Sequence, residues 1–360
     1  MTDATVDARP ETERRRGSAY AELLSRVRRE GLLDRRPVHY MVRIAVNAAL
    51  LVAGWTAFVL LGDSWWQLLV AAYLAGVFAQ TGFLGHDAGH RQIFRSRRAN
   101  DIAGLLHGNL AIGLAFGWWV DKHHRHHTHP NQEGLDPDIS AESIVFTDAQ
   151  ARGRSGVRRL LARYQAHLFF PMLLFEGVAL HVASVRAVSR SSYPKRGREA
   201  LLLGVHAVAY LTAVIMVLSP AQALAFVAVQ QGLFGLYLGS AFAPNHKGMP
   251  ILAKDDKADF LHRQVVTSRN VRGGWLVDFL LGGLNYQIEH HLFPSMPRPS
   301  LCRAQPLVRA YCVEHGLPYV ETGLFESYRQ ALRHLRIVGS GGTEPVADLR
   351  NVPGRSRHAG

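Results

Sequence analysis

Four long apolar stretches stand out along the chain. They are residues 41–61, 65–85, 200–218 and 221–243. Each is close to the length of about 20 residues that an α-helix needs to cross a lipid bilayer. Two short turn sequences, Gly62-Asp63-Ser64 and Ser219-Pro220, divide the stretches into pairs. The pattern therefore predicts an all-α membrane protein whose four transmembrane helices form two hairpins.

Two further apolar stretches, residues 102–120 and 160–188, are long enough to cross but contain polar groups. The first holds His107 and Asn109, and the second holds Glu176 among other charged residues. Such groups are costly at the centre of a bilayer. We therefore expect these segments to lie in the membrane interface, or to dip into it, rather than to cross.

The basic residues indicate the topology. No Lys or Arg occurs in residues 44–90 or 199–246, whereas residues 91–198 and both ends of the chain are rich in them. The positive-inside rule then places both termini and residues 91–198 in the cytoplasm. The formal net charge of +13 reflects this topology and anionic lipid, and no nucleic-acid-binding motif accompanies it. Lys is scarce relative to Arg, as is typical of a GC-rich bacterial genome, which favours the plasma membrane as the location.

Composition divides the chain into three parts. Residues 1–38 are polar and basic and lack the apolar core of a cleavable signal peptide, so we expect a basic cytoplasmic tail. Residues 39–338 are predicted to form the membrane domain. Residues 339–360 are rich in Gly and polar residues and are predicted to be a disordered C-terminal tail.

The chain has 19 histidines, and eight of them fall into three clusters. The clusters are His86-Asp87-Ala88-Gly89-His90, His123-His124-Arg125-His126-His127 and Gln287-Ile288-Glu289-His290-His291. On a helix, residues three or four positions apart share a face. Each cluster can therefore direct two or three side chains at one centre. Those side chains are His86 and His90, then His123, His126 and His127, then Gln287, His290 and His291.

These imidazoles favour a transition-metal centre, because neutral imidazole is the commonest protein ligand for such metals. Seven or eight of them exceed the four ligands of one tetrahedral zinc ion and fit two ions. With two cysteines in all, Cys302 and Cys312, a cysteine-based zinc site or iron–sulfur cluster is excluded. No Glu-x-x-His pair occurs, which excludes the carboxylate-bridged di-iron bundle. His-Glu-x-x-His is absent too, which disfavours a zinc protease.

All three clusters must lie on one face of the membrane if they bind one centre. An even number of crossings must then separate each pair of clusters, and four spans satisfy this condition. If residues 102–120 also crossed, the second cluster would be stranded on the opposite face. The metal hypothesis and the charge distribution thus predict the same topology, in which a cytoplasmic helical cap holds a dinuclear metal site.

The motifs resemble those of the integral-membrane fatty acid desaturases, a family with three histidine boxes around two irons. His-x-x-x-His, His-x-x-His-His and Gln-x-x-His-His occur in that order, and the resemblance extends over residues 39–339. Flanking sequences agree, including Trp118-Trp119, Asp136-Pro137-Asp138 and Leu292-Phe293-Pro294. Gln at the start of the third box is similar to the front-end, linoleoyl-CoA-like branch, which includes bacterial enzymes.

The resemblance implies a set of metal ligands. A further histidine commonly follows the fourth span in this family, and His246 occupies that place. The implied ligands are His86, His90, His123, His126, His127, His246, His290 and His291. Gln287 is either a ligand or a hydrogen-bonding neighbour. The residues that could orient imidazoles from behind are Asn245, Asp87, Asp136, Asp138, Asn285 and Glu289.

Four residues near the second box are candidates for substrate contact: Trp118, Trp119, Lys122 and Arg125. The two tryptophans could line an acyl tunnel or form an aromatic belt at the interface, and Trp119, one turn before His123, is the better tunnel candidate. The two basic residues could steer a CoA phosphate or a lipid head group, or could only set the topology.

The resemblance implies an O2-dependent fatty acyl desaturase that uses two non-haem iron ions and external electrons. It would introduce a cis double bond into an acyl-CoA or an acyl lipid. No His-Pro-Gly-Gly haem signature of cytochrome b5 is present, so we expect a separate electron donor, namely a ferredoxin, a cytochrome b5-like protein or a flavin/iron–sulfur reductase. A lipid hydroxylase on the same scaffold is the nearest alternative. A His-rich metal transporter is the alternative of another class, although transporter ligands normally lie near the bilayer midplane.

Overall fold

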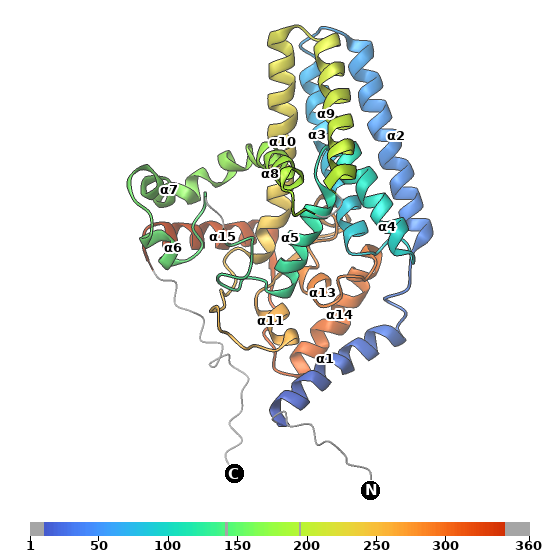
Figure 1. Ribbon diagram of the computed structural model, residues 1–360. Coiled ribbons are helices and arrows are strands. Elements are labelled where there is room, and N and C mark those ends of the chain that lie inside the picture. Colours follow the sequence, from blue (N-terminus) through green and yellow to red (C-terminus); the bar gives the residue numbers. More distant parts are fainter. Residues whose placement is uncertain (1–10, 141–142, 194–195, 343–360) are drawn as a thin grey trace.

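The computed structural model describes residues 11–140, 143–193 and 196–342, with the exception of the side chains of residues 11–18. Figure 1 shows a bundle of long helices at one end of the molecule and shorter helices gathered at the other. In chain order the elements are α1 (Glu11–Arg29), α2 (Pro37–Leu61), α3 (Gln67–Gly89), α4 (Arg97–Gly104), the π-helix η1 (Leu105–Ala111), α5 (Phe116–Thr128), α6 (Asp148–Arg152), α7 (Gly156–Leu173), α8 (Glu176–Ser189), α9 (Arg196–Val217), α10 (Pro220–His246), α11 (Phe260–Val266), β1 (Asn270–Arg272), α12 (Trp275–Leu280), α13 (Gln287–Leu292), α14 (Arg298–Glu314), β2 (Glu321–Gly323) and α15 (Leu324–Gly339).

The bundle consists of the helices α2, α3, α9 and α10, and each is long and apolar enough to cross a membrane. Helices α3 and α10 pack against each other more extensively than any other pair and form the interior of the bundle. Helices α2 and α9 expose apolar side chains such as Val59 and Ile215, as expected of surfaces that face lipid. The predicted all-α fold with four spans in two hairpins is confirmed.

Two of these helices continue beyond the predicted ends of their spans. Helix α3 extends from residue 85 to Gly89, and α10 extends from residue 243 to His246. The apolar pattern ends earlier because the last turns are polar. These turns stay helical, since their side chains are buried against the cap instead of facing lipid.

The two ambiguous apolar stretches are bent. Residues 97–111 meet α5 at 114°, and α7 meets α8 at 81°. Gly113, with a φ of +69°, allows the chain to reverse before α5. Asn109 is buried, but its side chain accepts a hydrogen bond from the backbone N–H of Phe116 at 3.1 Å. The side chain of Asn109 is thus satisfied within the protein, and neither stretch forms one straight span.

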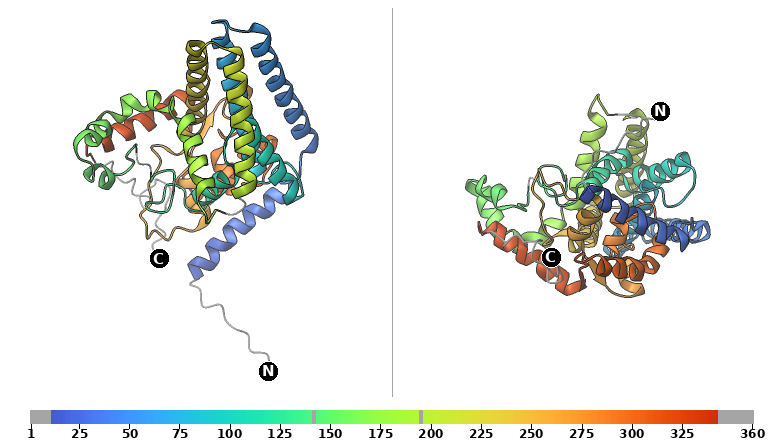
Figure 2. Two further views of the ribbon diagram at one scale, coloured as in Figure 1. Left: turned by 45° about the horizontal axis from the view of Figure 1, so that its top comes forward. Right: turned by 90° about the horizontal axis from the view of Figure 1, so that it is seen from below.

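A helical cap lies beneath the bundle (Figures 1 and 2). Helix α13 is at its centre, where Ile288 packs in one core with Val265 of α11, Tyr311 of α14 and Val27 of α1. Helix α1 falls within the predicted N-terminal tail, yet its side chains help to bury the third histidine cluster.

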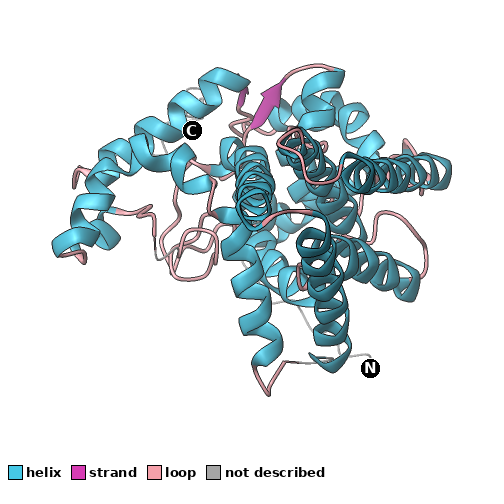
Figure 3. Ribbon diagram, turned by 90° about the horizontal axis from the view of Figure 1, so that it is seen from above, coloured by secondary structure: helices cyan, strands magenta, loops and turns pink. Residues whose placement is uncertain are grey.

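Figure 3 shows β1 and β2 at the edge of this helical molecule; they are parallel, with Asn270 opposite Glu321. Residues 343–360 of the predicted C-terminal tail lie outside the described residues.

Candidate metal centre

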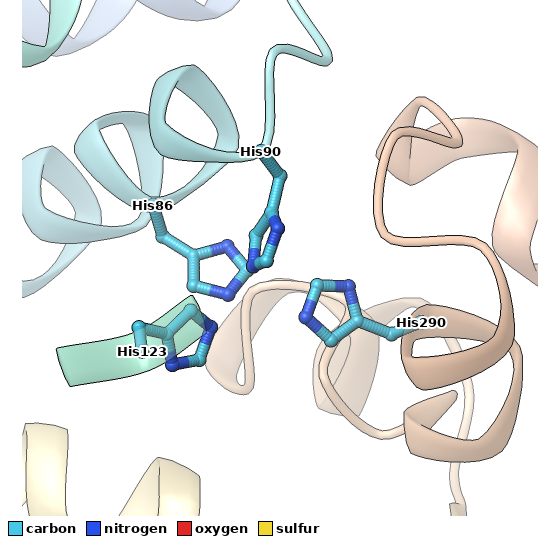
Figure 4. A group of neighbouring side chains, drawn as sticks. All are labelled: His86, His90, His123 and His290. Atoms are coloured by element: carbon cyan, nitrogen blue, oxygen red, sulfur yellow. The ribbon is translucent and has the colours of Figure 1, made fainter. Parts of the chain in front are cut away.

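The three histidine clusters meet at the base of the bundle, although they come from distant parts of the chain. The first lies at the end of α3, the second on α5 and the third on α13, and His246 joins them from the end of α10. Figure 4 shows the imidazoles of His86, His90, His123 and His290 directed toward one another from three separate segments.

These four histidines form the first donor group. One ring nitrogen of each lies within 4.8 Å of those of the others. The Nε2 atoms of His86, His90 and His290 are buried and have no hydrogen-bond partner among the described residues. Buried nitrogens without partners cost free energy, and a cation between them would satisfy all three. The residues present therefore fit a metal ion.

His126, His246 and His291 form the second donor group. The Nε2 atom of His246 lies 3.3 Å from that of His126 and 3.0 Å from that of His291. Two nitrogens bound to one ion at about 2.1 Å each are roughly 3.0–3.4 Å apart. The second group therefore also fits a metal ion.

His127 lies between the two groups. Its Nε2 atom is 3.1 Å from that of His123, and its ring stacks on His291 with the centroids 4.1 Å apart. The eight predicted ligands thus form one cluster with two centres, which is the arrangement that a dinuclear site requires. Their coordination of metal stays a prediction.

Asp136 orients His126 from behind. Both of its carboxylate oxygens lie 3.0 Å from His126 Nδ1, and one of them accepts a hydrogen bond from the backbone N–H of Asn131 at 2.7 Å. Burial lowers the pKa of His126, but the carboxylates of Asp136 and Asp138 outweigh it and raise the pKa overall. The contact with Asp136 holds a proton on Nδ1, which leaves Nε2 facing His246 and His291.

Two further rings are oriented by residues that belong to no recognisable motif. The Nδ1 atom of His246 is 2.9 Å from the carbonyl oxygen of Thr267, and that of His291 is 2.8 Å from Gln264 Oε1. Both partners lie at the end of α11, beneath the site. Neither residue could be recognised from the sequence, because nothing near it distinguishes it from other buried polar residues.

The remaining imidazoles outside the spans are held neutral. Burial lowers the pKa of His123, His127, His290 and His291 far below its ordinary value, and the neighbouring histidines lower it further. Neutral imidazole is the form that binds a metal ion.

Gln287 contacts the second donor group, and Asn245 contacts Gln287. The Nε2 atom of Gln287 is 2.8 Å from His246 Nε2, and Asn245 donates a hydrogen bond to Gln287 Oε1 at 3.3 Å. Rotation of the amide exchanges its nitrogen and oxygen, so this position can also present an acceptor to an ion. The position of Gln287 thus fits either of its two predicted roles.

Asp87 lies behind the first donor group. It is 3.4 Å from His86 Nδ1 and forms a buried ion pair with Arg298 at 2.6 Å. The ion pair connects the last turn of α3 to the start of α14. Asp87 therefore stands where a residue that orients His86 is expected.

An apolar cavity of about 330 Å³ lies beside the donor groups. Its wall comes from α3, α5, α7, α8 and α10 and includes Gly82, Leu180 and Leu238. Trp119 also lines it and stacks on His123 with the ring centroids 4.5 Å apart. The apolar part of this wall offers few hydrogen-bonding groups, so the ligand that suits it is an alkyl chain.

Two of the four predicted substrate residues line this cavity. They are Trp119 and Lys122, while Trp118 and Arg125 are not among its lining residues. Positions 118 and 125 are seven apart and share a different face of α5. Lys122 pairs with Asp138 at 2.6 Å, and this carboxylate outweighs burial and raises the pKa of Lys122.

Residues of other elements hold the N-terminus of α5, because no side chain of its own caps it. Glu199 of α9 accepts hydrogen bonds from the Gly117 N–H at 3.1 Å and from Tyr193 Oη at 2.9 Å. A carboxylate at this end is also favoured by the helix dipole. These contacts position the second histidine cluster. Glu199 could not be recognised from the sequence, because 82 residues separate it from its partner on α5.

Fold and site together define an integral-membrane protein with a buried, histidine-lined site for metal beside an apolar cavity. The profile of the fatty acid desaturase family matches residues 63–323 of the sequence. The chain belongs to the fatty acid desaturase family, as its histidine boxes predicted.

Curated relatives agree with this assignment. The chain is 30% identical to the acyl-lipid (9-3)-desaturase of Physcomitrium patens, in an alignment that covers 91% of this chain and 64% of the relative. It is 30% identical to the Delta(8)-fatty-acid desaturase of Euglena gracilis, over 85% of this chain and 75% of that protein. It is 29% identical to a Delta(5) fatty acid desaturase of Caenorhabditis elegans, over 89% of this chain and 74% of that protein. The chain thus spans less than two thirds of the Physcomitrium patens protein and about three quarters of the other two. The predicted front-end branch is confirmed.

Proposed function

We propose that the protein is an O2-dependent fatty acyl desaturase that introduces a cis double bond into an acyl chain. The observation that carries the proposal is the pair of histidine donor groups beside an apolar cavity. The proposed ligands of two non-haem iron ions are His86, His90, His123, His126, His127, His246, His290 and His291. Gln287 is proposed as a ligand or a close neighbour, and Asn245, Asp87, Asp136 and Asp138 as orienting residues.

The iron ions would supply the oxygen activation that no side chain can provide. The overall reaction combines one acyl chain, O2, two electrons and two protons, and yields one alkene and two waters. The chain itself contributes an apolar wall that holds the methylene groups beside the imidazoles and excludes water. Trp119 connects the apolar wall to the histidine cluster, because it lines the cavity and contacts His123.

The polar part of the cavity is proposed to face the group that carries the acyl chain. Lys247 lines it, lies 4.0 Å from the centroid of the Phe146 ring and donates a hydrogen bond to the Asp138 carbonyl at 3.1 Å. Lys122 lines it next to the Asp138 carboxylate. We infer that these two ammonium groups lie near the ester or thioester of an acyl lipid or acyl-CoA.

The active site and both termini are proposed to lie on the cytoplasmic face of the plasma membrane. The distribution of Lys and Arg supports this orientation. The proposed membrane domain, residues 39–338, contains the whole family match. A separate carrier is proposed to deliver electrons, with a ferredoxin, a cytochrome b5-like protein or a flavin/iron–sulfur reductase as the candidates.

The position of the imidazoles favours an enzyme over a metal transporter. His86 and His246 lie on the final turns of α3 and α10, whereas transporter ligands normally lie near the middle of their spans. A hydroxylase on the same scaffold would differ in its product, which would gain an oxygen atom instead of losing two hydrogens.

The proposal is tested by expressing the full chain in a host that lacks this activity and locating double bonds in its fatty acids. We expect a new unsaturated acid from the wild type and none from His126→Ala, which should also purify with less iron. His167→Ala removes an exposed histidine of α7 and serves as the matched control. A hydroxylated product, or unchanged activity of His126→Ala, would contradict the proposal.

A further inference from the structure

The turn that ends α3 carries an arginine where glycine is favoured. The N–H of Arg91 bonds to the carbonyl of Ala88, and the N–H of Gln92 bonds to that of Asp87, both at 2.9 Å. This pair of bonds is a Schellman C-cap, whose left-handed position usually holds glycine. Arg91 occupies it with a φ of +57°, which strains any residue with a Cβ atom. The turn does not require this side chain, so its presence calls for another explanation.

Arg91 is exposed and directly follows the buried His90, and His124 of α5 is a second exposed side chain close to His90. The ring centroid of His124 lies 6.1 Å from that of the buried His90. His90 belongs to the first donor group, so His124 connects this group to the protein surface.

Exposed basic residues flank His90 and His124 in the sequence. Arg125 follows His124 and is exposed, with Asp121 as an ion-pair partner at 3.3 Å. After Arg91 the chain continues with three more exposed arginines and no acidic residue up to position 98. They are Arg95, Arg97 and Arg98. We call Arg91, His124 and Arg125 the donor face.

We propose that the donor face docks an acidic one-electron carrier and that electrons enter the protein through His124 toward His90. The inference rests on the proposed function, which needs two electrons per double bond. The reduced carrier gives up one electron at each of two encounters and leaves oxidised. With O2, two protons from water and two hydrogens of the acyl chain, these electrons end in two water molecules.

Location and charge favour a protein carrier over a lipid head group as the occupant. A lipid needs only positive charge at the interface, whereas electron transfer needs closeness to the metal site because its rate falls steeply with distance. Arg91 directly follows His90 in the chain, and His124 lies in ring contact with it. Complementary charge steers such encounters, and redox partners typically use small interfaces.

The test uses the full-length protein in phosphatidylcholine nanodiscs and two acidic probes, a plant-type [2Fe–2S] ferredoxin and a soluble cytochrome b5 domain. Binding of each oxidised probe is measured at low ionic strength, and turnover is measured with each reduced probe. Arg91→Gly should keep or raise the thermal midpoint, because it relieves the turn, and should still raise the probe Kd about fivefold. Arg91→Glu should raise the Kd about tenfold or more. Arg333→Glu, at an exposed position of α15, is the matched control and should change neither the thermal midpoint nor the probe Kd.

His124→Ala separates docking from electron entry. We expect a Kd close to that of the wild type and a carrier-driven kcat that falls at least about tenfold. Single turnovers driven by dithionite bypass the carrier, so the Arg91 variants should still form the alkene. If the wild type forms none under dithionite and O2, the proposed function fails instead of the docking.

Three results would overturn the docking proposal. One is unchanged binding of both probes by Arg91→Gly and Arg91→Glu. Another is a wild-type protein that binds neither probe. The third is an effect of Arg91→Glu that appears only in nanodiscs containing phosphatidylglycerol, which would assign the donor face to lipid head groups.

Discussion

The Nε2 atoms of His246 and His291 lie 3.0 Å apart, although 45 residues separate them along the chain. His246 ends α10 of the membrane bundle, and His291 lies on α13 in the cap. The Nδ1 atom of each ring is held by its own partner, Thr267 or Gln264, so the two Nε2 lone pairs face each other. A cation bound by both nitrogens would remove the repulsion between their lone pairs. It would also link the cap to the bundle.

Replacement of His246 by Ala should remove one of two metal ions. The second donor group would keep only His126 and His291, which are too few to hold an ion tightly. We expect the iron content to fall from about two to about one per chain and desaturation to be lost. Elemental analysis of the purified protein measures the change, with exposed His315→Ala as the control. Full iron content and activity in His246→Ala would remove this residue from the ligand set.

Asp136→Asn should weaken the site without unfolding it. The amide retains the size of the carboxylate but no longer holds the His126 Nδ1 proton between two charged oxygens. Loss of such a partner typically costs 10–100-fold, so we expect about that loss in metal affinity or in rate. Metal titration and initial rates measure it, and Asp148→Asn on α6 is a control of the same chemistry. Wild-type values for both would show that Asp136 does not orient the ligand.

Gly117→Ala should disturb the second histidine cluster from a distance. A Cβ atom there would come within 2.5 Å of both Glu199 Oε1 and Tyr193 Oη. Overpacking of this kind costs about 1–3 kcal/mol of folding free energy, and it shifts the N-terminus of α5. We expect a lower thermal midpoint together with reduced iron retention.

The control for that variant is Gly204→Ala on α9, where an added Cβ meets no atom within 4 Å. Glu199→Gln, which keeps an acceptor oxygen for the Gly117 N–H, should be milder than Glu199→Ala. Equal effects of these two would show that the hydrogen bond to α5 does not carry the positioning.

Gly82→Phe should block the acyl cavity. An added Cβ at Gly82 would lie 3.7 Å from both Ile112 and Leu238, which leaves room for a methyl group but not for a ring. Gly82→Ala should therefore fold normally and reduce conversion of long chains about tenfold, and Gly82→Phe should abolish it. The fatty acid profile of expressing cells measures both, with Gly76→Ala on the same helix as control. Unchanged profiles would show that the acyl chain lies elsewhere.

The spans and the histidine spacing could be predicted because both are local properties. Apolar runs of membrane length and pairs such as His86 and His90 appear in any short window of the sequence. The exact ends of α3 and α10 could not be predicted from the same signal. Their last turns are polar, and they stay helical only because the cap covers them.

The surroundings of the histidines depend on contacts between distant segments. Val27 helps to bury the third cluster although it lies in a basic, polar segment of the sequence. Gln264 lies 27 residues from its partner His291, and Glu199 lies 82 residues from its partner Gly117. No sequence pattern near either residue predicts these contacts. The spacing of Trp119 from His123 already favoured it over Trp118 as a tunnel residue, and the orientation of α5 places Trp119 at the cavity.

By itself, the sequence determined that the chain spans a membrane four times and offers three groups of imidazoles on one side of it. The length of an apolar run and the spacing of histidines on a helix are properties of one local segment. They can be recognised without knowing which other segments pack against it. The tertiary structure decided how the imidazoles divide into two donor groups, which residues hold each ring, and which side chains line the cavity. These outcomes depend on how helices far apart in the chain pack together, and packing is a property of the whole fold.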